Sequence, residues 1–333
     1  MTLSSSVATT SGESIRSNSP NKITALLEVK DLYIDFFTHA GIVKGLSGVS
    51  LSVRPGEMSA IVGESGAGKS VLAWSILGLT RAPGRVVGGE ILWRGENLLS
   101  ANEQRLNAIR GKEISLIVSN PRSHLHPLTT VGKQIEAVSV GDDNAHEVRQ
   151  ATLAALRDVE MPDPLRVYQS YPHELSGGMA QRVLIAMALI NSPQLVIADD
   201  ATSALDVTVQ RQVLDLMSNL IGRSNASALM ITHDFGVVAQ YCKRAIVMFG
   251  GEIYEAAETQ QLFENPLHSY TQALLASARR RRSEAVANRS EIGSRTRSID
   301  PSSYLVEEEP DHWVRRSRSD DVPEVSKVRG GRP

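Results

Sequence analysis

The sequence contains only one cysteine, Cys242, among its 333 residues. A single thiol can form neither an intrachain disulfide nor a multi-cysteine metal cluster, and such sparse use suits a reducing compartment. No apolar run approaches the roughly 18 to 20 residues that a bilayer-spanning helix needs, and the N-terminus lacks a basic segment followed by an apolar one. These absences predict an intracellular chain whose only contact with a membrane is peripheral.

Neither sign of charge dominates the chain. Its 35 Lys and Arg residues are balanced by 37 Asp and Glu residues, which gives a formal net charge of −2. Without an overall basic field, indiscriminate nucleic-acid binding is not expected. Hydrophobic residues make up 41% of the chain, which is enough for a substantial core in one large domain or two modest ones.

A glycine-rich segment is the most informative feature of the sequence. It reads Gly63-Glu64-Ser65-Gly66-Ala67-Gly68-Lys69-Ser70, follows the apolar run Ala60-Ile61-Val62 and precedes Val71, where a helical pattern begins. This is the pattern GxxxxGK[ST] in its strand–loop–helix context, and it predicts a phosphate cradle. The alternative, a glycine-rich turn without a ligand, loses weight beside the motifs farther along the chain.

The residue types of this segment suit phosphate binding for separate physical reasons. Glycines allow the backbone to turn back and direct its N–H groups at phosphate oxygens, while the helix that opens near Lys69 adds the positive end of its dipole. We expect Lys69 to reach the β- and γ-phosphates of a nucleotide. We expect Ser70 to supply its hydroxyl to Mg²⁺, which takes few protein ligands and completes its coordination with substrate oxygens.

Composition divides the chain into three parts. Residues 1–24 are rich in Ser, Thr and Asn and predict a disordered leader, because they carry too little apolar surface to offset the entropy of ordering. Residues 25–278 alternate strand and helix patterns and form the predicted folded domain, with a helical insertion over about 121–180. Residues 279–333 form a C-terminal extension that we expect to be partly disordered.

Periodicity gives the expected elements. Strand patterns cover 27–29, 32–34, 49–53, 58–62, 114–118, 195–198 and 228–232, with hairpins over 87–99 and 245–253. Helical spacing of apolar residues covers 71–79, 147–159, 180–189, 207–220 and 270–278. Strands that alternate with helices in this way predict an α/β fold.

Further motifs follow the phosphate loop in order. Ser176-Gly177-Gly178 opens a helix whose N–H groups can face an anion, although capping alone would also explain this start. The run 195–198 leads to Asp199-Asp200, which places a carboxylate at the end of a buried strand where it can bind Mg²⁺. The segment Ser203-Ala204-Leu205-Asp206 comes next, and Thr232-His233-Asp234 follows the next strand.

This set of motifs resembles the signature, Walker B strand, D-loop and switch histidine of ABC-type ATPases. The resemblance covers about 27–276, and within the family the chain is most similar to ATP-binding subunits of dipeptide, oligopeptide and nickel importers. That narrower likeness depends on 121–134, Ala204–Gln210 and Pro266–Leu275. The resemblance implies a P-loop NTPase (RecA-like) core with an antiparallel β subdomain and an α-helical subdomain of ABC type.

The resemblance also implies a mechanism and partners. Two such domains sandwich two ATP molecules, each between the phosphate loop of one domain and the signature of the other. ATP binding closes the dimer and hydrolysis opens it, which drives two integral membrane permease subunits between their states and imports a solute from a solute-binding protein. The chain would then lie at the cytoplasmic face of the inner membrane as a peripheral subunit, with the helical insertion against the permeases and no nucleic-acid partner.

The implied ligands are ATP and Mg²⁺. The resemblance assigns Asp199 to the metal beside Ser70, and it assigns Lys69, Asp200 and His233 to catalysis. Phe36, or alternatively Phe37, would stack on adenine, and a place in the core is an equally good interpretation of either ring.

Two positions depart from the family pattern. Asp200 stands where the family usually has glutamate, and retracting a catalytic carboxylate by about an ångström can cost on the order of 10²-fold in rate. Ser119 stands where the family has a glutamine that links the γ-phosphate and Mg²⁺ to the membrane subunit, and Asn120 would replace it only in part. Because Ser176, Gly177 and Gly178 keep the signature intact, we predict the catalytically weaker half of a heterodimer with a second, non-identical ABC ATPase subunit. The neutral interpretation is that Asp200 does the same work from a slightly shifted backbone.

The C-terminal extension departs from its relatives as well. Peptide-branch relatives often carry a run of cysteines there that can bind an iron–sulfur cluster, and because this chain has only Cys242, no cluster is expected. The segment Tyr304–Arg316 still resembles the end of that extension, which predicts a remnant docked on the core with Trp313 as a buried anchor.

Two other functions stay open from the sequence. A regulatory or scaffold ABC cassette that binds ATP with little hydrolysis would account for Ser119 and Asp200. A soluble non-transport ABC protein acting on ribosomes or DNA is less favoured, because neither a second phosphate loop nor a sustained heptad pattern is present.

Overall fold

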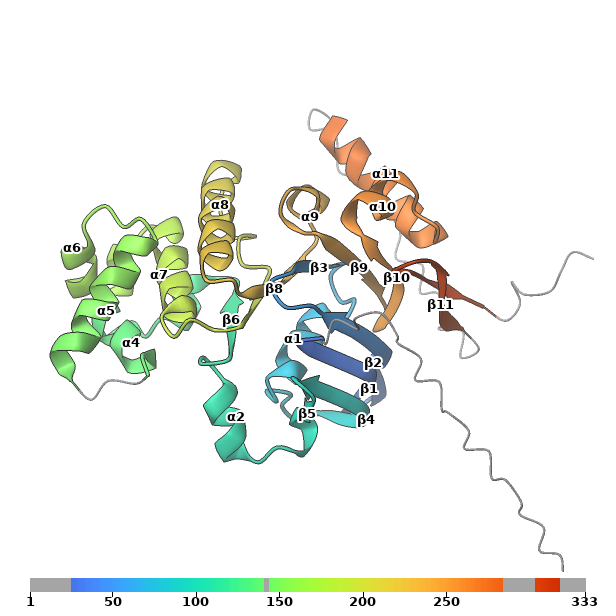
Figure 1. Ribbon diagram of the computed structural model, residues 1–333, viewed down its shortest axis with the longest axis horizontal. Coiled ribbons are helices and arrows are strands. Elements are labelled where there is room, and N and C mark those ends of the chain that lie inside the picture. Colours follow the sequence, from blue (N-terminus) through green and yellow to red (C-terminus); the bar gives the residue numbers. More distant parts are fainter. Residues whose placement is uncertain (1–24, 141–143, 284–302, 318–333) are drawn as a thin grey trace, which may run out of the picture.

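Two β-sheets and a group of helices at one end make up the fold (Figure 1). The computed structural model describes residues 25–140, 144–283 and 303–317. The predicted leader, 1–24, and the segments 284–302 and 318–333 of the C-terminal extension lie outside the described residues, so their predicted disorder stays a prediction.

The larger sheet has eight strands in the order β11-β12-β10-β9-β3-β8-β7-β6. The parallel strands are β3 (Met58–Val62), β6 (Ile114–Val118), β7 (Leu195–Asp199), β8 (Ser227–Thr232) and β9 (Arg244–Phe249), and β6 forms one edge of the sheet. The antiparallel strands β10 (Glu252–Glu258), β12 (His312–Arg316) and β11 (Tyr304–Glu309) extend the opposite edge. Because parallel strands end at the same edge, the segments that follow β3, β6, β7 and β8 lie together.

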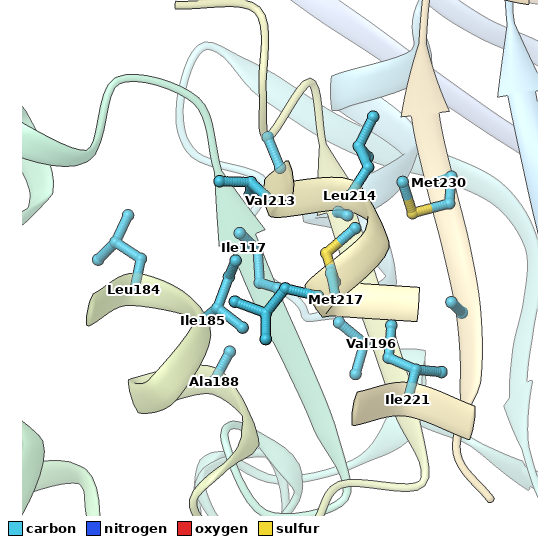
Figure 2. Packing of buried hydrophobic residues seen from close by; sticks show 14 of the residues in the cluster. Ile117, Leu184, Ile185, Ala188, Val196, Val213, Leu214, Met217, Ile221 and Met230 are labelled. Carbon is cyan, nitrogen blue, oxygen red and sulfur yellow. The ribbon is translucent and has the colours of Figure 1, made fainter. Parts of the chain in front are cut away.

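The central strands are buried on both faces, as their continuous apolar runs predict. Val196 and Ala198 of β7 face one core, while Leu195 and Ile197 face the other. The first core lies under α7 (Gly177–Leu189) and α8 (Val207–Arg223). Figure 2 shows this core, where Val196 packs among Ile185, Met217 and Ile221. The second core lies between the sheet, α1 (Lys69–Ile76) and the smaller sheet.

The smaller sheet is antiparallel, with four strands in the order β2-β1-β4-β5. Its strands are β1 (Leu27–Thr38), β2 (Gly41–Val53), β4 (Gly84–Trp93) and β5 (Glu96–Asn97). The separate strands predicted over 27–29 and 32–34 are one strand, because Asp31 takes a φ of 44° and the pairing with β2 and β4 resumes after a register shift. This bulge hides the continuity of β1 from a pattern-based interpretation.

A group of helices projects from the end of the large sheet beyond β6 (Figure 1). It consists of α3 (Pro121–His124), α4 (Val131–Val138), α5 (Ala145–Asp158), α6 (Pro164–Gln169) and the start of α7, with a 3₁₀ turn at Pro172–Glu174. The remaining helices are α2 (Glu103–Ile109), α9 (Phe235–Tyr241), α10 (Thr259–Glu264) and α11 (Ser269–Ser283), and a further 3₁₀ turn covers Leu98–Ser100. In the part of the chain that the structure describes, no helix has the length and apolar character to span a membrane.

The C-terminal hairpin β11–β12 docks on the edge strand β10, where Val314 pairs with Glu255 and Trp313 with Ala256. The prediction that Trp313 is a buried anchor is wrong, because the residue is 36% exposed. Successive strand residues face opposite sides, so His312 and Val314, both 0% exposed, turn inward while Trp313 turns outward. His312, and not Trp313, is therefore the buried residue that packs the hairpin against the domain.

Candidate nucleotide site

The glycine-rich segment forms a tight loop between the end of β3 and the start of α1. Gly66 and Gly68 take φ values of 82° and 96°, in the left-handed region that favours glycine. Gly63 is required for a different reason, since a Cβ there would lie 2.0 Å from the Met248 carbonyl oxygen. The loop therefore has a shape that other residue types would distort, and it leads directly into the N-terminus of α1, where an anion is favoured.

Lys69 lies across this loop. Its Nζ donates hydrogen bonds to the carbonyl oxygens of Gly63 at 2.8 Å and Glu64 at 2.7 Å. Burial lowers the pKa of the Lys69 ammonium, and the negative charges of Asp200, Asp199 and Glu64 oppose that shift. The Lys69 ammonium is therefore held against the loop by two of the loop's own carbonyl oxygens.

Ser70 and Asp199 meet beside the loop although they are distant in sequence. The Ser70 hydroxyl donates to Asp199 Oδ1 at 2.9 Å. Burial raises the pKa of the Asp199 carboxyl and the Asp200 charge raises it further, whereas the Ser70 hydrogen bond and Lys69 lower it. One hydroxyl and one carboxylate suit Mg²⁺, which prefers oxygen ligands. The described residues hold no cluster of three or more His, Cys, Asp or Glu side chains that would cage a metal, so nucleotide oxygens would have to complete the coordination.

Asp200 and His233 lie next to each other at the ends of β7 and β8. Their Oδ1 and Nδ1 atoms are 3.4 Å apart, and the side chains are 39% and 62% exposed. Asp200 has a φ of 50°, and its N–H donates to the Ile231 carbonyl at 2.9 Å, which ties the end of β7 to β8. Both side chains thus face solvent at the same sheet edge as the phosphate loop.

Ser119 directly follows β6, whose last residue Val118 pairs with Asp199. This register brings Ser119 to the same edge as the acidic pair, where the side chain is half-buried. The next residue, Asn120, is exposed and takes a φ of 55° before α3 begins. The structure therefore brings Ser119 to the edge that carries Ser70, Asp199 and Asp200.

The two candidate aromatic residues differ in their surroundings. Phe36 is half-buried, and its ring lies 2.5 Å from where a Cβ on Gly45 would be placed. The Gly45 carbonyl in turn lies 2.9 Å from the corresponding position on Gly68, so Phe36 borders the strand that touches the loop. Phe37 is 43% exposed, with the Arg85 guanidinium 5.4 Å above its ring.

The signature Ser176-Gly177-Gly178 begins α7, and the Ser176 hydroxyl accepts the Met179 N–H at 3.2 Å as an N-cap. A Cβ on Gly178 would lie 2.7 Å from Val209 Cγ1, so glycine permits the close contact between α7 and α8. The start of α8 is capped in the same way by Asp206, whose Oδ1 accepts the Val209 N–H at 3.0 Å. Figure 1 shows α7 with the helical group and α1 between the large and the small sheet, so the signature and the phosphate loop occupy different parts of the molecule.

The structure adds a support for the loop that the motifs do not contain. The turn between β9 and β10 packs against the loop, and the Gly251 N–H donates to the Ala67 carbonyl at 3.0 Å. The pair Gly250-Gly251, with φ values of 55° and 82°, was the available sequence signal for a tight turn there.

Comparison with protein families matches residues 46–203 to the ABC transporter family. The probable peptide ABC transporter ATP-binding protein y4tR of Sinorhizobium fredii is 46% identical over 271 residues, which span 80% of this chain and 81% of the relative. The oligopeptide transport ATP-binding protein OppD of Bacillus subtilis is 44% identical over 259 residues, which span 77% of this chain and 72% of the relative.

Solved structures of ATP-binding cassettes have a similar fold. The dimeric post-hydrolysis structure of the cassette MJ0796, bound to ADP and Pi, matches with a TM-score of 0.63 and 27% identity over 70% of this chain and 98% of that chain. The structure of cbiO1 from Clostridium perfringens matches with a TM-score of 0.62 and 23% identity over 73% of this chain and 92% of that chain, which supports the fold alone.

Proposed function

Because the chain belongs to the ABC transporter family of ATP-binding proteins, we propose that it is the ATP-binding subunit of an importer for peptides or a related small solute. Relatives named for peptide and oligopeptide transport support the solute class. The main observation in support of ATP binding is that Lys69, Ser70 and Asp199 lie together at one loop. A phosphate-sized anion and a hard divalent cation are the ligands that this combination suits.

The residues divide the work of holding MgATP. The N–H groups of the loop 63–70 and the Lys69 ammonium would hold the β- and γ-phosphates, while the Ser70 hydroxyl and the Asp199 carboxylate would hold Mg²⁺. Bound Mg²⁺ would neutralise phosphate charge and polarise the bond that breaks. The half-buried Phe36 is the proposed adenine contact, because it borders the strand beside the loop.

The same proposal includes the partners. Two permease subunits, a solute-binding protein and a second ABC ATPase would complete the importer, with this chain bound peripherally at the cytoplasmic face of the membrane. The dimeric state of the similar cassette MJ0796 supports pairing of two cassettes. The separation of α7 from the phosphate loop supports it as well, since the signature would serve a nucleotide held mainly by the other cassette.

We further propose that this chain is the weaker catalytic half of the pair. Asp200 would orient water with a shorter side chain than glutamate, and His233, 3.4 Å away, would contact the γ-phosphate beside it. Ser119 lies at the same edge and would leave the metal without the longer amide of a glutamine. Binding would survive these changes because Lys69, Ser70 and Asp199 are all in place, whereas hydrolysis would slow.

The proposal is tested in two stages. The isolated full-length chain should bind MgATP in calorimetry, and Lys69→Ala should abolish binding, whereas the same change at the surface residue Lys112 should not. In the complex assembled with its partners, Asp200→Ala should leave most ATP turnover in place. A collapse of turnover in that variant would contradict the weak-site assignment, and a native particle with two copies of this chain and no second ATPase would contradict the heterodimer.

A further inference from the structure

The end of β9 and the turn that follows it contact the phosphate loop at two points. The Met248 carbonyl oxygen touches Gly63 at the start of the loop, at 2.0 Å from where a Cβ would lie. The Gly251 N–H donates to the Ala67 carbonyl near the end of the loop at 3.0 Å, and the Gly251 carbonyl accepts the Ser47 N–H at 2.9 Å. A movement of this turn would therefore be transmitted to the loop by direct backbone contacts.

Phe249, the last residue of β9 and directly before this turn, belongs to an aromatic cluster with Tyr254 and Tyr270. The ring centroids of Phe249 and Tyr270 are 4.7 Å apart, and those of Tyr254 and Tyr270 are 5.5 Å apart. The Phe249 and Tyr254 rings meet edge to face with centroids 5.7 Å apart. Tyr254 lies at the register shift between Ile253 and Glu255, and Tyr270 is the second residue of α11. Tyr270 therefore contacts Phe249, which directly precedes the turn that supports the loop.

Tyr270 also faces the loop directly. Its hydroxyl oxygen is shielded from solvent and completes no hydrogen bond with any residue that the structure describes. Burial raises the pKa of this phenol and the Glu64 carboxylate raises it further, whereas the nearby Glu64 backbone N–H, which does not complete a hydrogen bond, lowers it. The hydroxyl thus lies opposite the first peptide of the phosphate loop. Buried hydroxyl groups without a hydrogen-bond partner are uncommon, so we expect this hydroxyl to form a hydrogen bond in another state of the protein.

The position of Tyr270 is set by a buried carboxylate. Glu255 accepts the Leu267 N–H at 2.8 Å and the His268 N–H at 3.0 Å, which fixes the chain just before α11. The same carboxylate lies 2.7 Å from His312 Nε2 on the C-terminal hairpin, and both side chains are 0% exposed. The segment Pro266–Leu275, which marks the importer branch in the sequence, therefore has a defined place behind the phosphate loop.

We propose that Tyr270 is a positioning residue of the nucleotide site. Its ring steadies the β9–β10 turn through Phe249, and its hydroxyl accepts the Glu64 N–H when the loop tightens around the phosphates. This inference rests on the proposed binding of MgATP. It adds that the C-terminal part of the domain helps to set nucleotide affinity, with Tyr270 acting through the loop and without touching the nucleotide.

The test compares tyrosine-to-phenylalanine variants of the full-length chain. Tyr270→Phe keeps the ring and removes only the hydroxyl, so the Kd for MgATP should rise roughly threefold to tenfold, the effect of one net hydrogen bond. The melting temperature without nucleotide should not change, because the hydrogen bond is absent from that state. The matched control is Tyr241→Phe, which removes a hydroxyl that donates to Asp215 at 2.6 Å outside the cluster and should leave the Kd unchanged.

Each outcome decides the matter. An unchanged Kd in Tyr270→Phe would overturn the proposal while wild-type binding of MgATP leaves the proposed function intact. A weaker Kd accompanied by a lower melting temperature without nucleotide would also overturn it, since the hydroxyl would then be structural. A wild-type chain that binds no MgATP would overturn the proposed function, and this inference with it. Tyr270→Leu also removes the ring and should bind more weakly than Tyr270→Phe, and equal affinities would contradict the route through Phe249.

Discussion

Asp200 combines a short carboxylate with a backbone conformation that few residue types tolerate. Its φ of 50° lies in the left-handed region, where Asp and Asn are found more often than other residues with a side chain. Its carboxylate is nevertheless 39% exposed and lies 3.4 Å from His233 Nδ1. At this position the backbone conformation favours Asp over Glu, whereas the reach needed to orient water favours the longer side chain of Glu.

We predict that Asp200→Glu increases hydrolysis at this chain's own site. The added methylene extends the carboxylate by about an ångström, which can be worth on the order of 10²-fold in rate. The measurement is ATP turnover of the assembled complex in which the partner's catalytic carboxylate is replaced by an amide, so that only this site contributes. Asp200→Asn is the matched control, since it keeps the backbone preference and loses the charge. A rate for Asp200→Glu no higher than that of the parent would show that side-chain length is not what limits the site.

Substitutions at two glycines of the phosphate loop distinguish the cost of a steric clash from the cost of an unfavourable backbone conformation. Gly63→Ala should destabilise the protein by about 3 kcal/mol or more and abolish MgATP binding, because the new methyl group would meet the Met248 carbonyl oxygen at 2.0 Å. Gly66→Ala should cost only about 1–2 kcal/mol, because nothing lies within 4 Å and only the φ of 82° is unfavourable. Urea unfolding of both variants gives the comparison, and equal losses would contradict the steric account.

At the scale of elements, the C-terminal hairpin is joined to the domain by a buried pair and by a surface cluster. His312 and Glu255 form the buried pair at 2.7 Å. Outside it, Asp311 accepts two hydrogen bonds from Arg54 at 2.7 and 2.8 Å and lies 3.6 Å from Arg244. Because Arg54 follows β2 and Arg244 begins β9, the hairpin connects the small sheet to the large one.

The buried pair should dominate the docking of the hairpin. His312→Ala would leave the buried Glu255 side chain without its side-chain hydrogen-bond partner, which costs about 1–3 kcal/mol, and it would also remove the packing of a fully buried ring. Glu309→Ala is the control, because Glu309 is 45% exposed and lies 3.9 Å from the other ring nitrogen. Chemical unfolding should show a large loss for the first variant and a change within about 1 kcal/mol for the second. Similar losses would mean that the buried contact is not the main one.

The surface cluster should make the hairpin sensitive to acid. The Arg54 hydrogen bonds and the nearby Arg244 charge hold the pKa of the Asp311 carboxyl below its usual value of 3.8. A depressed pKa in the folded state stabilises the protein above the unfolded pKa, and this contribution disappears as the pH falls below about 4. Asp311→Asn should therefore cost at most about 1 kcal/mol at pH 7, because the pair is partly exposed, and the difference from wild type should shrink at pH 3. Urea midpoints at both pH values test this, and a constant difference would contradict it.

The secondary-structure elements could be predicted from the sequence where the interactions that form them are local. The loop 63–70, α7 and the strand before Asp199 were predicted because glycine, capping and apolar patterns act over a few residues. Long-range contacts were not predictable, which explains why β1 was divided at Asp31 and why Trp313 was preferred to His312 as the buried residue. Glu255, the partner of His312, is far from it in the chain, and so is Phe249 from Tyr270, and no spacing rule connects either pair.

At the scale of the whole molecule, the two predicted anion sites of one chain are separated. The phosphate loop leads into α1, which lies between the two sheets, whereas the signature begins α7 on the side of the helical group (Figure 1). In addition, Val207 at the start of α8 is 83% exposed, although it is apolar and follows directly after Asp206. These features favour a second cassette against this side, which would bring its own nucleotide to Ser176.

This arrangement predicts that the signature of this chain matters more for turnover than its own catalytic residues. Ser176→Asp would keep the N-cap of α7, since Asp caps as well as Ser, but would place a negative charge against the partner's nucleotide. Ser176→Asn caps equally well without the charge. In the assembled complex, ATP turnover should be lost in Ser176→Asp, largely retained in Ser176→Asn, and only modestly reduced by Asp200→Ala. If Ser176→Asp leaves turnover unchanged, this chain contributes no catalytic contact to its partner, and the regulatory cassette becomes the better interpretation.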